Sequence, residues 1–172
     1  MAMSITIGEL RQHFFDVAHW IDPADTVDQV LRGDPDRAVT RVGMGWTPCV
    51  NNLRAAAADG CELFITHEAL FYGEWAPGVD SADTPWGRAR TAVLEENDLA
   101  LIRHHDTWDN FPELGICDAW RAFLGLHDVI AERPYYYPGR GRFAPRNSLA
   151  LCRTRPRTLR EFAEDVAERC RV

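Results

Sequence analysis

The alternation of apolar and polar positions predicts helices and strands in turn along this chain. Apolar residues recur at helical spacing over about 6–19, and Thr6 and Glu9 form the T-x-x-E pattern of a capping box at its start. We expect an amphipathic helix there. The stretch 22–35 is rich in Asp, Pro and Gly, which favours irregular structure, and residues 38–46 after it are typical of a strand.

The middle of the chain repeats the order of helix and strand. Pro48 suits the first turn of a helix that runs to about residue 58, and Thr84 with Pro85 begins another that runs to about residue 97. Each helix is followed by a short run of apolar residues, at 63–66 and at 99–102. Because these runs lack alternating polar positions, we expect strands that are buried on both faces.

The remaining elements complete an α/β pattern. A loop or broken helix is predicted over 68–81, a helix near 117–125, a strand over 149–152 and a last helix over 158–169. Strands that alternate with helices predict an α/β fold. We expect a mixed or largely parallel sheet flanked by helices.

Length and charge suggest how the chain is organised. It has 172 residues, enough for one domain with a core but too few for two ordinary ones. All 19 basic residues are arginine, which excludes Schiff-base lysine and P-loop lysine chemistry. Residues 1–132 hold 9 arginines against 22 acids, whereas 133–172 hold 10 arginines against 4 acids. We therefore expect an α/β domain over 1–132 and an arginine-rich start of a second half over 133–172.

Cysteine usage and hydrophobicity indicate the compartment and the partners. The five cysteines form no C-x-x-C pair, so neither a disulfide framework nor a zinc ribbon is indicated. No apolar run reaches signal-peptide length or the roughly 20 residues that a membrane span needs. We expect a cytoplasmic protein with no membrane partner. The acidic excess disfavours nonspecific DNA binding, and we expect no specific nucleic-acid partner. The arginines of 133–160 either hold a phosphate or an acidic surface, or form a solvated face, the more frequent case.

Histidines and carboxylates follow the two buried strands. They are His67 and Glu68 after the first strand, and His104, His105, Asp106 and Asp109 after the second. The carboxyl ends of parallel strands line the ligand crevice of open α/β sheets, so these groups would converge if the strands are neighbours. Imidazole and carboxylate suit Zn, Fe, Mn, Ni or Cu better than Ca or Mg. A catalytic ion would use two or three of these ligands and leave one position for water.

Each of these residues also has a structural alternative. His67 could instead satisfy backbone groups at the end of its strand. Glu68 is a metal ligand, a general base or a surface acid. His104 and His105 point to opposite faces if the strand continues, so at most one of them faces the crevice. Asp106 and Asp109 are also compatible with caps in a loop, which is the commoner use of aspartate beside Thr.

Residues 66–72, which follow the first buried strand, are T-H-E-A-L-F-Y. At this segment and after the second strand the chain resembles the Nif-three-like family of dinuclear-metal proteins, also named GTP cyclohydrolase 1 type 2, which shows T-H-H-P-L-F-F after a strand. The family also shows H-x-x-x-D followed by P-x-x-G, which residues 105–109 and 112–115 match. A G-D-P-D run at 33–36 precedes a strand, as in the family. The resemblance covers about 30–126 and implies a Nif-three-like fold.

The resemblance implies particular site residues and some departures. His67 and Asp109 would bind one metal, with His105 near them, and Glu68 stands where the family has a histidine ligand of a second metal. That change keeps a donor but alters its charge and hardness. The family's W-D-N-x-G stretch is not reproduced, since residues 25–28 are D-T-V-D. A C-terminal H-x-x-x-E motif that completes the family's metal pair is also missing.

Three interpretations of that missing motif are open. The chain is a fragment, or it is a short form that holds one metal through His67, Glu68 and Asp109, or another subunit supplies ligands. The resemblance implies one or two divalent ions per chain, of Zn, Fe, Mn or Ni, and a homo-oligomer in the form of a hexameric ring.

The resemblance and the residues together suggest two functions. The first is a metal-dependent hydrolase of a nucleotide or related small molecule, in which metal-bound water supplies hydroxide and Glu68 or His105 handles the proton. The alternative is a non-catalytic metal-binding scaffold, metal carrier or regulatory protein.

Overall fold

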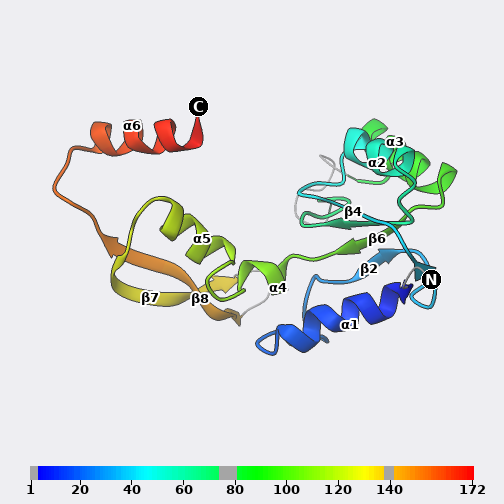
Figure 1. Ribbon diagram of the computed structural model, residues 1–172, viewed down its shortest axis with the longest axis horizontal. Helices are drawn as coiled ribbons and strands as arrows, with labels where there is room; N and C mark the ends of the chain where they lie inside the picture. The colour runs from blue at the N-terminus through cyan, green and yellow to red at the C-terminus, as the bar shows by residue number, and fades with distance from the viewer. Residues whose placement is uncertain (1–3, 74–80, 138–141) are drawn as a thin grey trace. The chain divides into compact units, whose positions relative to one another are not determined.

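The computed structural model describes residues 4–73, 81–137 and 142–172, and the chain divides into two compact units (Figure 1). The first unit is Met1–Thr107 and the second is Trp108–Val172. The boundary that the charge pattern suggested, after residue 132, falls inside strand β7 (Asp128–Tyr137).

A four-stranded mixed sheet forms the centre of the first unit. Its strand order is β2-β6-β5-β4. The bounds are Val30–Arg32 for β2, Ala100–Arg103 for β6, Leu63–Thr66 for β5 and Val42–Gly45 for β4. Strands β4, β5 and β6 are parallel, and β2 runs antiparallel to β6. The predicted α/β fold with a mixed sheet is therefore confirmed.

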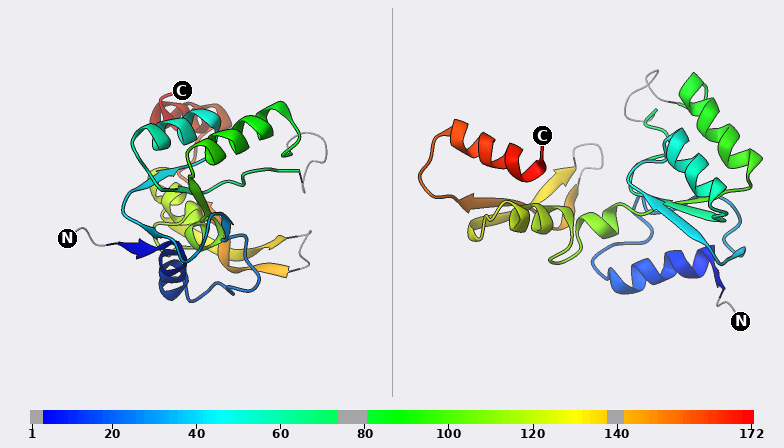
Figure 2. Two further views of the ribbon diagram at one scale, coloured as in Figure 1. Left: turned by 90° about the vertical axis from the view of Figure 1, so that its right-hand side faces the viewer. Right: turned by 45° about the horizontal axis from the view of Figure 1, so that its top comes forward.

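Helices cover both faces of this sheet, as Figures 1 and 2 show. Helices α2 (Val50–Ala58) and α3 (Pro85–Glu96) connect the parallel strands and share one core with the sheet. Helix α1 (Ile7–Val17) packs on the opposite face through a second core. The sheet is thus buried on both sides, as the uninterrupted apolar runs predicted, and all four residues of β5 are buried.

Local signals in the sequence account for where the helices begin. The Thr6 hydroxyl accepts a hydrogen bond from the Glu9 N–H, and the Glu9 carboxylate accepts one from the Thr6 N–H at 2.8 Å. This is the predicted capping box. The Thr84 hydroxyl accepts the Gly87 N–H in the same way, and Pro85 is the first residue of α3. Pro48, in contrast, lies before α2, whose N-cap is Cys49.

The strand predicted over 38–46 is interrupted. Its first part is β3 (Ala38–Val39), which pairs antiparallel with β1 (Ile5–Thr6), and the chain rejoins the main sheet only at β4. At the break, the Glu62 carboxylate accepts hydrogen bonds from the N–H groups of Thr40 and Arg41, at 2.7 and 3.1 Å. A side chain thus takes the place of a neighbouring strand as the hydrogen-bond acceptor.

Several elements were not predicted, strands β1 and β7 among them. Strand β2 lies within the stretch 22–35, which was expected to be irregular. It was not predicted because three residues are too few to show an alternating pattern. Helix α4 (Asp106–Asp109) begins and ends at the two aspartates that were also compatible with caps in a loop. Its last residue, Asp109, is one of the candidate site residues.

The second unit contains two helices and a two-stranded ribbon. Helix α5 spans Ile116–Phe123 and α6 spans Leu159–Cys170, while β7 pairs antiparallel with β8 (Arg142–Arg153). The strand predicted at 149–152 is the end of this longer strand. Arg153 pairs with Asp128 at 3.1 Å and Arg157 with Asp165 at 2.9 Å, so two of the clustered arginines bind acids of their own unit.

Across the described residues, no helix is both long enough and apolar enough to cross a membrane.

Candidate metal centre

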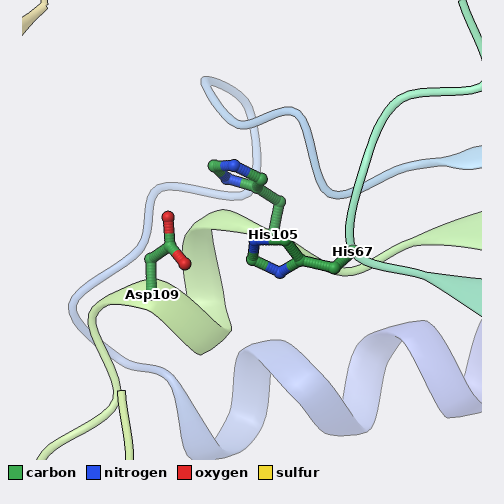
Figure 3. Close-up of side chains that lie close together, drawn as sticks. All are labelled: His67, His105 and Asp109. Atoms are coloured by element: carbon green, nitrogen blue, oxygen red, sulfur yellow. The ribbon is translucent and has the colours of Figure 1, made fainter. Parts of the chain in front are cut away.

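His67, His105 and Asp109 form a group with the composition of a metal site. Each offers one ligand atom, and these atoms all lie within 4.8 Å of one another (Figure 3). His67 follows β5 and His105 follows β6. The hydrogen-bond ladder continues past the strand ends, where the His104 N–H donates to the Thr66 carbonyl at 2.8 Å. The parallel pairing of β5 and β6 therefore brings the two histidines together.

Helix α4 accounts for the position of the third ligand. It begins at Asp106, directly after His105, and ends at Asp109. Residues four apart lie on the same side of a helical turn. The H-x-x-x-D spacing thus places the carboxylate beside the imidazole through one turn of backbone.

Aromatic stacking surrounds His67. Its ring lies 4.0 Å from that of Trp46, between centroids, and 4.4 Å from that of His105, with interplanar angles of 26° and 23°. Trp46 follows β4, so the three parallel strands contribute one ring each at their carboxyl ends. Sequence reasoning did not assign Trp46 to the site, because it ended a predicted strand without any other sign of function.

The surroundings of His67 favour its neutral form. Burial lowers the pKa of His67, and the nearby His105 lowers it further, against an opposing contribution from Glu68. Metal ions bind neutral imidazole, so the environment keeps His67 in the form that a metal requires.

His104 lies outside this group. Its ring stacks on Phe14 of α1, with centroids 4.0 Å apart and planes 9° apart. Burial is also the main reason why the pKa of His104 is lowered. Only one of the two adjacent histidines thus joins the candidate site, and the other packs against a helix.

Glu68 is not part of the three-residue group that the described residues form. Its carboxylate accepts a hydrogen bond from the Tyr72 hydroxyl. Burial, together with this bond and the charge of Glu68, raises the pKa of Tyr72 to about 12, so the phenol stays protonated as a donor. The role of Glu68 as ligand or base stays a prediction.

Asp106 contacts the candidate ligand His105 directly. Its Oδ1 lies 3.1 Å from His105 Nδ1, and its Oδ2 accepts hydrogen bonds from the Thr26 hydroxyl and the Val27 N–H, at 2.9 and 3.2 Å. Burial would raise the pKa of Asp106, but these hydrogen bonds outweigh burial and lower it below its usual value. A charged carboxylate therefore sits behind the imidazole.

A second carboxylate, Asp28, holds the backbone of the same turn. Its Oδ1 accepts hydrogen bonds from the N–H groups of His105 and Asp106, at 2.6 and 2.9 Å. Its Oδ2 accepts a hydrogen bond from the N–H group of Thr107 at 2.8 Å. Sequence reasoning missed Asp28 and Thr26. The available signal was that this segment departs from the family's W-D-N-x-G stretch.

Comparison with known proteins identifies the family. The family described as Duf34/NIF3 (NGG1p interacting factor 3) matches residues 12–172. The chain belongs to the Duf34/NIF3 family. The family resemblance of the two strand-end segments is thereby confirmed.

Named relatives and solved structures agree with this assignment. A GTP cyclohydrolase 1 type 2 homolog of Streptomyces coelicolor is 32% identical over 146 residues, which cover 84% of this chain and 48% of the relative. The Chlamydia pneumoniae protein of the same name is 28% identical over 120 residues, which cover 66% and 44%. This Duf34/NIF3 chain thus spans about half the length of the curated relatives it matches.

The fold of the whole chain is similar to that of Staphylococcus aureus protein SA1388. That crystal structure has a TM-score of 0.65 at 17% identity, over 98% of this chain and 66% of the other.

Proposed function

We propose that this Duf34/NIF3 protein binds a divalent transition-metal ion through His67, His105 and Asp109 and hydrolyses a nucleotide or related small molecule there. The observation that carries the proposal is the convergence of these three ligand atoms within 4.8 Å. The relatives named GTP cyclohydrolase 1 type 2 homolog support the nucleotide class of substrate.

The donor set fits Zn, Fe, Mn or Ni. Two imidazoles and one carboxylate are typical of catalytic sites that hold an ion by three protein ligands and leave a position for water. Ligand atoms around one tetrahedral ion lie about 3.4 Å apart, given bonds of about 2.1 Å. The observed spacing therefore requires only a modest adjustment of the three side chains.

The reaction follows from the chemistry of such a site. His67, His105 and Asp109 would hold the ion, which would supply hydroxide at neutral pH by lowering the pKa of its bound water to about 7. Glu68 is the proposed proton acceptor, since it adjoins His67 in the chain and is oriented by the Tyr72 hydroxyl. His105 is the alternative proton carrier when it is not a ligand.

Metal binding is tested first. The protein is stripped with a chelator, loaded separately with Zn, Mn, Ni or Fe(II), desalted and analysed for metal content. We expect one ion per chain, lost in His67→Ala and Asp109→Ala and retained in the matched control His127→Ala, whose histidine is exposed. Two ions per chain would favour a dinuclear centre instead, and no bound ion would overturn the proposal.

Hydrolysis is tested on the metal-loaded protein. We expect turnover of GTP or of another member of a nucleotide panel, abolished in His67→Ala and strongly reduced in Glu68→Gln. If the loaded protein binds one ion but turns over none of these compounds, the hydrolase assignment fails. The non-catalytic alternative, a metal-binding scaffold, carrier or regulator, would then describe the protein.

The hexameric ring remains a prediction from the family resemblance. Light scattering of the purified protein would give a mass of six chains if the ring forms.

A further inference from the structure

The turn that carries two of the three proposed ligands is held by a carboxylate from a distant part of the chain. Asp28 precedes His105 by 77 residues and is only 1% exposed. It accepts hydrogen bonds from three successive backbone N–H groups, those of residues 105, 106 and 107. The same turn ends in Asp109.

These hydrogen bonds decide the conformation of the turn. The first N–H groups of any helix have no acceptor within the helix, and four residues are too few for a helix to be stable alone. Asp28 supplies the missing acceptors to α4 and to the residue before it. Burial of a carboxylate is costly unless it is hydrogen-bonded, so the three bonds also hold Asp28 in place.

The segment that contains Asp28 also orients the His105 ring. The Thr26 hydroxyl and the Val27 N–H both donate to Asp106, and Asp106 contacts His105 Nδ1. A carboxylate contact of this kind holds the ring of a ligating histidine in one orientation. Backbone and ring are thus both fixed from residues 26–28.

We propose that Asp28 is a positioning residue of the metal centre, which sets the placement of His105 relative to Asp109 through the backbone of the turn. The inference rests on the proposed metal-binding function and concerns the affinity and geometry of that site. Outer-shell partners of metal ligands typically change affinity by about 10- to 100-fold when they are replaced.

Asp28→Asn tests the proposal, because it keeps the size of the side chain but replaces one acceptor oxygen by an NH₂ group that faces N–H donors. Chelator-treated protein is titrated with Co(II) while visible absorption is recorded. We expect about 10- to 100-fold weaker binding and a changed Co(II) spectrum, which reports the ligand geometry. Thermal unfolding of the metal-free protein is measured in parallel.

Thr84→Ala is the matched control, since it removes the acceptor of the Gly87 N–H at the start of α3. It should lower the melting temperature and leave both the affinity and the spectrum of Co(II) unchanged. Wild-type affinity and spectrum in Asp28→Asn would overturn the inference. If the wild-type protein itself binds no Co(II), the proposed function fails instead.

Thr26→Val keeps the proposal testable if Asp28→Asn does not fold. The Thr26 hydroxyl accepts a hydrogen bond from the Asp28 N–H at 3.1 Å and donates one to Asp106. The isosteric valine therefore loosens Asp28 without altering its carboxylate, and it also removes the donor to Asp106. Weaker Co(II) binding with a changed spectrum is expected, and unchanged values would overturn the inference.

Discussion

His67 and His105 lie ring to ring, with centroids 4.4 Å apart, at the ends of the adjacent parallel strands β5 and β6. His104, the residue before His105, lies outside this pair, and its ring stacks on Phe14. The two adjacent histidines therefore have separate roles: His105 belongs to the candidate metal centre, and His104 packs against α1.

Substitution by phenylalanine separates these roles. His104→Phe retains a ring that can stack on Phe14, so we expect the metal content of the wild type. His105→Phe removes a proposed ligand and should lose the bound ion. Elemental analysis after loading with Zn measures both variants. Loss of metal in His104→Phe together with retention in His105→Phe would reverse the assignment.

Trp46 should contribute to stability through its ring contact although its side chain is 54% exposed. Aromatic pairs add about 0.5–1.5 kcal/mol beyond the area that they bury, so Trp46→Ala should lower the free energy of unfolding by at least that amount. Trp86→Ala is the control, because Trp86 is 72% exposed and should change stability by less than about 0.5 kcal/mol. Urea denaturation of the metal-free protein compares the two.

Gly33→Ala should be among the most damaging glycine substitutions. Gly33 has a φ of +102°, and a Cβ atom there would lie 2.7 Å from the Cβ of Ala100 on β6. Backbone strain and the clash together should cost at least about 2 kcal/mol of unfolding free energy. Gly60→Ala is the matched control, since its φ is +71° but the nearest atom, on Arg41, is 3.7 Å away. Gly60→Ala should lower the unfolding free energy by only about 1–2 kcal/mol. Equal losses of unfolding free energy in the two variants would show that the clash at residue 33 is relieved.

The contribution of Glu62 to stability should depend on pH. Hydrogen bonds from the backbone and hydroxyl of Thr40 and the backbone of Arg41 lower the pKa of Glu62 below its ordinary value. The folded state therefore prefers the ionised carboxylate, whose contribution is full above that value and is lost as pH falls through the folded pKa.

Thermal unfolding of Glu62→Gln between pH 3 and 7 measures this dependence. We expect a lower melting temperature than that of the wild type near neutral pH and a difference that shrinks below about pH 4.5. Thr40→Val removes one donor and keeps the carboxylate, so its difference should be intermediate. A difference that does not change with pH would contradict the assigned cause.

Much of the first unit was predictable because its signals are local. The capping box of Thr6 and Glu9 and the Thr84-Pro85 pair act within one turn of helix. The buried strands consist of uninterrupted apolar runs, which indicate burial on both faces. The break between β3 and β4 was not predictable. It depends on Glu62, which lies about twenty residues further along the chain.

The sequence by itself determined the candidate ligands, because His67 and His105 directly follow apolar strands and Asp109 stands at helical spacing from His105. Only the tertiary structure decided which groups meet. The register of β5 on β6 placed the two rings together. The antiparallel pairing of β2 with β6 placed Thr26 and Asp28, which precede β2, beside the ligand turn. Hydrogen bonds between segments almost eighty residues apart leave no periodic trace in either segment, so only the folded backbone reveals them.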